Sequence, residues 1–174
     1  IDYPFQLSQG KGSLRAWISL DRARLAGFTA DLALAGVAAR MGPELPPLNL
    51  ARVSGRLSAH EELLPDAQEG KPTFGANGHT VAIEHFTVAL ADGRVLPPST
   101  VSETYTPARA GKPQRVAVEA TQVDLAALAQ LAAQLPLSPL QRQLLADFAP
   151  RGQLTDFSAS WDGAYPRLAG YRVK

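Results

Sequence analysis

The chain lacks cysteine altogether, has a single methionine, and is poor in charge: Asp, Glu, Lys and Arg make up 19% of its 174 residues. Without cysteine, a disulfide scaffold, a cysteine-ligated zinc site and thiol catalysis are excluded. Seventeen basic residues against sixteen acidic ones leave a formal net charge of +1, which argues against nucleic acid as a partner. No apolar run approaches the roughly 18–20 residues of a membrane-spanning helix, so we expect no transmembrane helix in this segment.

The amino terminus shows no start signal. The chain opens with Ile1-Asp2-Tyr3-Pro4 and carries neither a basic n-region nor an apolar h-region there. We therefore expect an internal fragment of a longer protein, folded as one β-rich domain over residues 1–174. Hydrophobic residues make up 45% of the chain, which indicates either a large core or an apolar surface that has a function.

Alternating apolar and polar residues predict β-strands over most of the chain. In the range 13–21, for example, Leu14 and Ile18 fall on one face, whereas Arg15 and Trp17 fall on the other. The same period of two predicts further strands at 28–34, 52–60, 80–91, 101–106, 116–120, 157–161 and 169–174.

Several breaks divide these strands. The apolar phase changes within 80–91, which predicts a β-bulge near Glu84-His85. Ala91-Asp92-Gly93 is typical of a turn, and Pro97-Pro98 is expected to bound the following strand. The polar range 61–73 is predicted to be a long hairpin loop.

From Val123 onward the pattern becomes helical. Asp124 is a good N-cap for a first helix that Pro136 ends. Ser138-Pro139-Leu140-Gln141 is a capping box with proline at the first helical position, which predicts a second helix. We expect a helical hairpin over 124–149 within a mainly β (α+β) fold, whose curved antiparallel sheet forms an open groove or half-barrel.

Residues suited to catalysis or metal binding are scattered. His60, His79 and His85 form neither a His-x₃-His pair nor a His-Glu-x-x-His motif. There is no Gly-x-Ser-x-Gly nucleophile motif, and no two carboxylates are paired in an apolar setting. We therefore predict no catalytic residues, no metal site and no cofactor, and the sequence argues against an enzyme.

Bulky apolar residues on the predicted strand faces are the remaining candidates for a functional surface. If the helical hairpin covers the sheet, they form the core; if the sheet is an open trough, they line a groove for lipid acyl chains. Such a groove offers burial and dispersion without unpaired polar groups. The candidate groove residues are Leu14, Ile18, Phe28, Leu32, Leu57, Phe86, Leu90, Phe157 and Trp161.

Two blocks resemble a known family. The first contains Gly12–Trp17, Ala30–Leu34 and Leu45–Leu57; the second contains Val123–Ala129, Leu135-Pro136 and the segment from Ala149 to Trp161. Together they look like the central periplasmic region of YhdP-type proteins, which belong to the AsmA-like group that includes TamB. The similarity covers most of the chain and is weakest over 61–116.

The resemblance implies a function that spacing alone does not show. Proteins of this kind are anchored by one inner-membrane helix, extend through the periplasm as β-sheet units with a hydrophobic groove, and take part in phospholipid transport to the outer membrane and in barrier maintenance. It implies phospholipid acyl chains and neighbouring domains of the same chain as partners. The alternative is a structural or protein-interaction module of an envelope protein, without direct lipid contact, whose sheet edges pair with neighbours.

Overall fold

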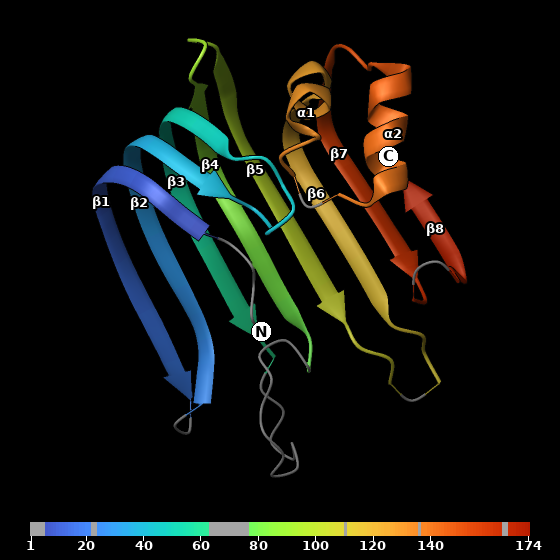
Figure 1. Ribbon diagram of the computed structural model, residues 1–174. Helices are drawn as coiled ribbons and strands as arrows, with labels where there is room; N and C mark the ends of the chain where they lie inside the picture. The colour runs from blue at the N-terminus through green and yellow to red at the C-terminus, as the bar shows by residue number, and fades with distance from the viewer. Residues whose placement is uncertain (1–5, 22–23, 63–76, 110, 136, 165–166) are drawn as a thin grey trace.

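The computed structural model describes all residues except 1–5, 22–23, 63–76, 110, 136 and 165–166. Eight antiparallel strands form one sheet in which each strand lies beside its neighbours in sequence, so that β1 and β8 are the two edges (Figure 1). Two helices follow β6. The elements are β1 (Gln6–Asp21), β2 (Arg24–Arg40), β3 (Leu48–Glu61), β4 (His79–Leu90), β5 (Val95–Thr106), β6 (Arg115–Asp124), α1 (Leu125–Leu131), α2 (Pro139–Phe148), β7 (Gln153–Asp162) and β8 (Gly170–Val173).

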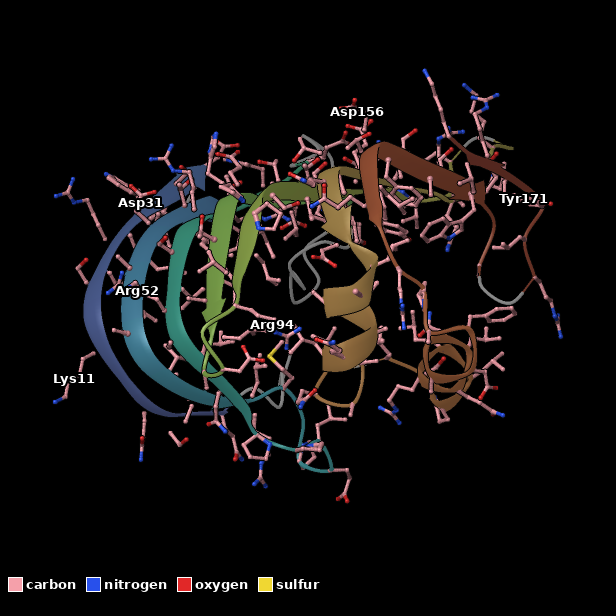
Figure 2. The ribbon with its side chains drawn as sticks, turned by 90° about the horizontal axis from the view of Figure 1, so that it is seen from above. Lys11, Asp31, Arg52, Arg94, Asp156 and Tyr171 are labelled. Carbon is pink, nitrogen blue, oxygen red and sulfur yellow. The ribbon has the colours of Figure 1, made fainter. Side chains whose placement is uncertain are left out.

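The sheet is strongly curved at one end. Strands β1, β2 and β3 curl over at the end that holds the start of β1, and helices α1 and α2 lie on the side toward which they curl (Figures 1 and 2). In the second half of β2, Gly36 has a φ of 58°, which is readily adopted only by glycine. The sheet therefore has a concave face and an outer face.

Register assigns the side chains to these two faces, because directly opposed residues point to the same side of a sheet. One row of opposed residues crosses seven strands and is apolar throughout: Ala16, Ala30, Leu57, Ile83, Val101, Ala120 and Phe157. The residues that alternate with this row are mostly polar or charged. The predicted two-faced strands are thus confirmed.

The compact core lies where the curled ends fold back over the sheet. Val37 and Leu50, from the curled parts of β2 and β3, pack with Val53 and Val88 in one buried cluster. Leu131 of α1 packs against this cluster as well. Since residues on both sides of the β2 bend meet in one cluster, the apolar face of the sheet is its concave face.

The helical segment begins where its capping residues predict. The Asp124 side chain accepts a hydrogen bond from the Ala127 amide at 2.9 Å, and Ser138 and Gln141 form the reciprocal capping box. Helix α1 buries Ala127, whereas α2 buries none of its residues. The mainly β fold with a small helical part and a curved, open sheet is confirmed.

Of two predicted strand irregularities, the bulge near Glu84-His85 is present and the boundary at Pro97-Pro98 is not. His85 has a φ of 50°, and the pairing of β4 with β3 and with β5 shifts register beside it, which confirms the bulge. The predicted strand boundary at Pro97-Pro98 is wrong, because β5 runs through both prolines. They fall at a register shift against β4, and the described pairing with β6 starts only at Val101, so their missing N–H groups break no ladder there.

One expectation falls largely outside the described residues. The hairpin loop predicted at 61–73 lies mostly within 63–76. Asp92-Gly93 does form the predicted turn, in which the Gly93 amide donates to the Leu90 carbonyl at 3.1 Å. None of the described helices is long and apolar enough to cross a membrane.

Candidate functional site

On the concave face, large apolar side chains are buried under the curl and exposed along the edge strand β1. Under the curl, Val53 and Leu90 are each 5% exposed. Beyond it, Leu14, Ile18 and Leu20 of β1 are 68–69% exposed although their side chains belong to the apolar rows. Large apolar side chains of β1 on this face are therefore open to solvent, whereas Ala30 and Ala59 in the same rows are buried.

The predicted groove residues divide into three groups. Leu14, Ile18 and Phe28 are exposed and lie on the concave face of β1 and β2. Leu90 is buried in the core cluster, so it forms part of the packed end of the face. The remaining five are half-buried on the same face: Leu32, Leu57, Phe86, Phe157 and Trp161.

Phe86 reaches this face only because of the bulge at His85. The extra residue in the bulge returns the apolar side chains of β4 to the concave face. Gly55 of β3 provides the space opposite Phe86. A Cβ at Gly55 would lie 3.1 Å from the Phe86 ring and 3.0 Å from the Glu84 carbonyl oxygen. A glycine on one strand and a bulge on the next thus place an aromatic ring on the concave face.

Some exposed apolar residues of this face were not singled out from the sequence. Val81 and Val101 are 38% and 37% exposed, and they lie in the same apolar rows as Ile18 and Ala16. Their strand periodicity was visible in the sequence. Their position in the row, however, depends on the register of neighbouring strands.

The outer face carries a row of alternating charges across the first four strands. Asp31 stands opposite Arg15 on one side and Arg56 on the other, and Arg56 stands opposite Glu84. The Arg56 Nε donates to Asp31 Oδ1 at 2.6 Å and its Nη2 to Oδ2 at 3.1 Å. This side-chain hydrogen bonding from Arg56, aided by the charges of Arg56 and Arg15, holds the pKa of Asp31 below its ordinary value.

Aromatic and acidic residues complete the outer face. Trp17 is 45% exposed there, with the Arg15 guanidinium carbon 6.0 Å from its ring centroid. The Asp31 and Asp156 labels lie on the side away from the helices in Figure 2. The outer face therefore has the hydrated, charge-paired character that the concave face lacks.

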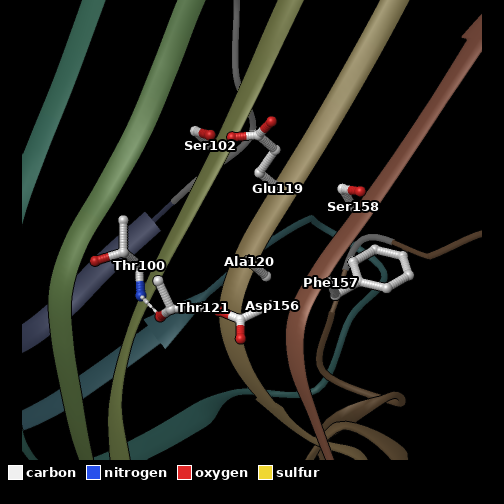
Figure 3. Close-up of a pocket in the computed structure, with 8 residues that line it drawn as sticks. All are labelled: Thr100, Ser102, Glu119, Ala120, Thr121, Asp156, Phe157 and Ser158. Atoms are coloured by element: carbon white, nitrogen blue, oxygen red, sulfur yellow. Dashed lines mark hydrogen bonds between the residues drawn. The ribbon is translucent and has the colours of Figure 1, made fainter. Parts of the chain in front are cut away.

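A shallow pocket lies on the outer face over β5, β6 and β7 (Figure 3). Its polar groups are hydroxyls and two carboxylates, and the Thr121 hydroxyl accepts a hydrogen bond from the Thr100 amide at 3.0 Å. The lining contains no histidine, lysine or arginine; it consists of Thr100, Ser102, Glu119, Ala120, Thr121, Asp156, Phe157 and Ser158.

Helix α1 is attached to the turn between β4 and β5 by polar contacts. Arg94 pairs with Asp92 at 2.7 Å and also donates a hydrogen bond to the Gln130 side chain of α1. Hydrogen bonds from the Arg94 side chain and backbone amide lower the pKa of Asp92. These contacts, together with Leu131 in the core, hold α1 across the packed end of the concave face.

The described histidines lie apart. His60 and His79 are on the neighbouring strands β3 and β4, and His85 is at the bulge. Among the residues that the structure describes, no group of three or more His, Asp or Glu residues is placed to hold a metal ion.

The fold and its two faces define a class: an open, curved antiparallel sheet whose concave side is apolar and partly uncovered. Comparison with protein families places the chain more narrowly. The family model described as YhdP protein matches residues 3–174, so the chain belongs to the YhdP family. This membership confirms the family resemblance seen in the sequence and suggests a cell-envelope protein. No curated protein and no solved structure gave a significant match.

Proposed function

We propose that this chain is a non-enzymatic segment of an inner-membrane-anchored periplasmic protein and holds phospholipid acyl chains on its concave face. In this role it would contribute to phospholipid transport to the outer membrane and to maintenance of the envelope barrier. The observation that carries the proposal is the apolar row that crosses seven strands, together with the exposure of Leu14, Ile18 and Leu20 on the same face.

The dimensions of the exposed area suit a lipid tail. The seven residues of β1 from Leu14 to Leu20 extend about 20 Å, since each step along a strand is roughly 3.3 Å. One leaflet of a bilayer has a hydrocarbon depth of about 15 Å, half of the ~30 Å core. An acyl chain can therefore lie against these strands over its whole length.

The energetics favour low specificity. Each buried methylene contributes about 0.8 kcal/mol, and the apolar rows place no charged side chain beside the middle of the tail. Tails of different length and saturation can thus bind the same surface, as passive transport requires. YhdP family membership supports the proposal, because it suggests an envelope protein.

The test is a pair of adjacent substitutions on β1. Ile18→Asp places a carboxylate on the concave face, whereas Ser19→Asp places the same group on the outer face of the same strand. After delipidation and exposure to phospholipid, native mass spectrometry should show roughly tenfold less lipid bound to Ile18→Asp, since loss of about 1.4 kcal/mol is a factor of ten. Ser19→Asp should retain wild-type binding.

Absence of bound lipid in the wild-type chain, with unfolding data showing an intact fold, would overturn the proposal. It would instead favour the alternative of an interaction module, for which the edge strand β1, exposed along all its residues, is the observation in support.

A further inference from the structure

The two edges of the sheet differ in length and in how open they are to a further strand. β8 has four residues, Gly170–Val173, whereas β1 has sixteen, all of them exposed. Edge strands are commonly kept short or interrupted by proline, which prevents pairing with another chain. β1 contains no proline, and no described strand pairs with its second side. It therefore presents a long row of backbone N–H and C=O groups to which a further strand can be added.

Most of this edge is regular. From Lys11 to Ser19, β1 pairs with β2 without a register shift, and the extra residue at the shift after Ser19 lies in β2. The side chains of β1 therefore alternate between the two faces over this range. An additional strand would meet apolar side chains on the concave side and polar ones on the outer side.

The sequence of β1 is complementary to a second copy of itself that runs in the opposite direction. When Ala16 stands opposite the partner's Ala16, Leu14 stands opposite the partner's Ile18 on the concave face. On the outer face, Lys11 then stands opposite the partner's Asp21. A twofold axis at Ala16 makes each of these two pairs occur twice, and unlike charges directly opposed across two strands are stabilising.

The same register places an aromatic ring beside a second cation. Arg15 stands opposite the partner's Trp17, whose ring is 45% exposed in the single chain. Within one chain the Arg15 guanidinium carbon already lies 6.0 Å from the Trp17 ring centroid. Since a cation near an aromatic face is attracted to the ring, the pairing adds one such contact on each side of the axis.

Neighbouring registers lose this complementarity. Only shifts by an even number of residues keep the two apolar faces on the same side. A shift by two in one direction places Arg15 opposite the partner's Arg15, and like charges directly opposed are destabilising. A shift by two in the other direction moves Lys11 past Asp21, where β1 ends. The side chains of β1 therefore favour the register centred on Ala16.

We propose that the chain forms a symmetric dimer in which the two β1 strands pair antiparallel around a twofold axis at Ala16. Opposed residues share a face, so the concave faces of the two copies lie side by side and form one apolar surface. The flanks of Leu14 and Ile18, each 68–69% exposed in the single chain, gain cover from the partner strand. This interface is carried by β1 alone and does not depend on lipid binding.

The absence of native cysteine makes the register directly testable. Ala16→Cys places two thiols opposite each other, where paired strands hold Cα atoms about 4.5–5.5 Å apart, within the range of a disulfide. Under mild oxidation this variant should form a covalent dimer, measured by intact mass. Leu14→Cys is the matched control on the same face of β1, because its two copies lie about 13 Å apart, four residues along the strands, and it should stay largely monomeric. Equal cross-linking of both variants, or none of Ala16→Cys, would overturn the proposal.

A charge swap tests the same pairing without a covalent bond. Lys11→Asp opposes two carboxylates on each side of the axis and should weaken the dimer about tenfold in sedimentation equilibrium. Adding Asp21→Lys restores unlike pairs with exchanged signs and should return most of the affinity. Lys112→Asp, the same charge change at an exposed residue between β5 and β6, should leave the dissociation constant at its wild-type value.

Circular dichroism should show that all of these variants keep their strand content. A wild-type chain that stays monomeric up to submillimolar concentration would overturn the dimer. A double variant that associates as weakly as Lys11→Asp alone would contradict the pairing of Lys11 with the partner's Asp21, and with it the proposed interface.

Discussion

Single residues separate the two faces of this sheet. Arg56 and Asp31 show how the outer face is stabilised. Their side chains are 47% and 41% exposed, and the Arg56 guanidinium forms two hydrogen bonds with the Asp31 carboxylate between β3 and β2. Exposed pairs contribute little to stability in general. Here the bidentate geometry and the flanking charges of Arg15 and Glu84 favour one strand register, because a slip of one residue would separate all four.

This arrangement predicts a pH-dependent coupling between Asp31 and Arg56. Since the pKa of Asp31 is lowered in the fold, the pair stabilises the folded chain above the ordinary value of 3.8 and loses its effect as pH falls through the folded pKa. A double-mutant cycle with Asp31→Asn and Arg56→Gln, measured by denaturant unfolding, should give a small favourable coupling at pH 7. The coupling should disappear in strong acid and shrink at about 1 M salt, where the Debye length is about 3 Å. A coupling that persists in acid would contradict the assignment.

At the scale of elements, helix α2 is held mainly by its own sequence. None of its residues is buried, and Leu140, Leu144 and Phe148 on one side of it are exposed. Its start is fixed by the capping box of Ser138 and Gln141, and its end by Ala149 in a left-handed conformation. Because none of its residues is buried, α2 depends on these local interactions more than on packing.

Removing the N-cap side chain should therefore destabilise helix α2 without destabilising the sheet. Ser138→Ala is expected to cost about 0.5–2 kcal/mol of local helix stability. Hydrogen exchange should show faster exchange of the α2 amides, with those of β3 and β4 unchanged. Gln143→Ala, an exposed position within the same helix, serves as the control and should leave exchange as it is. A parallel loss of protection in the sheet would show that α2 stabilises the fold as a whole.

The elements also show how far sequence reasoning extends. Alternation identified the strands, and the residues around Asp124 and Ser138 identified the helix starts, because these signals are local. The first residues of β1 were missed, since Gly10-Lys11-Gly12 has no alternation; pairing with the Ala-rich second half of β2 makes them extended. Likewise, the passage of β5 through Pro97 depends on a register shift against β4, which is set by tertiary structure.

The candidate groove was only partly predictable for the same reason. The sequence assigned the apolar residues to one face, and the register agrees with that assignment. It could not separate Leu90 from Leu14, because the difference between them arises when the ends of β2 and β3 curl over Leu90. Burial here is set by long-range folding of the sheet onto itself.

Taken as a whole, the molecule has a packed end and an open end on the same apolar face. The two ends should respond differently to the same change. Leu90→Ala removes a buried side chain and should destabilise the fold by about 2–5 kcal/mol, whereas Leu14→Ala, at 68% exposure, should stay within about 0.5 kcal/mol. Chemical denaturation of both variants measures the difference directly. Similar losses for both would show that the open end is covered in solution.

The order of the strands has a further consequence, for the way the sheet assembles. Each strand pairs only with its neighbours in sequence, from β1 to β8. Each strand meets its partner across a single connection, of which the one between β6 and β7 is long and holds the two helices, so loop-closure costs stay small for most pairs. The spatial order of the sheet can therefore also serve as an order in time: a chain that emerges amino terminus first can add each new strand to an edge that has already formed.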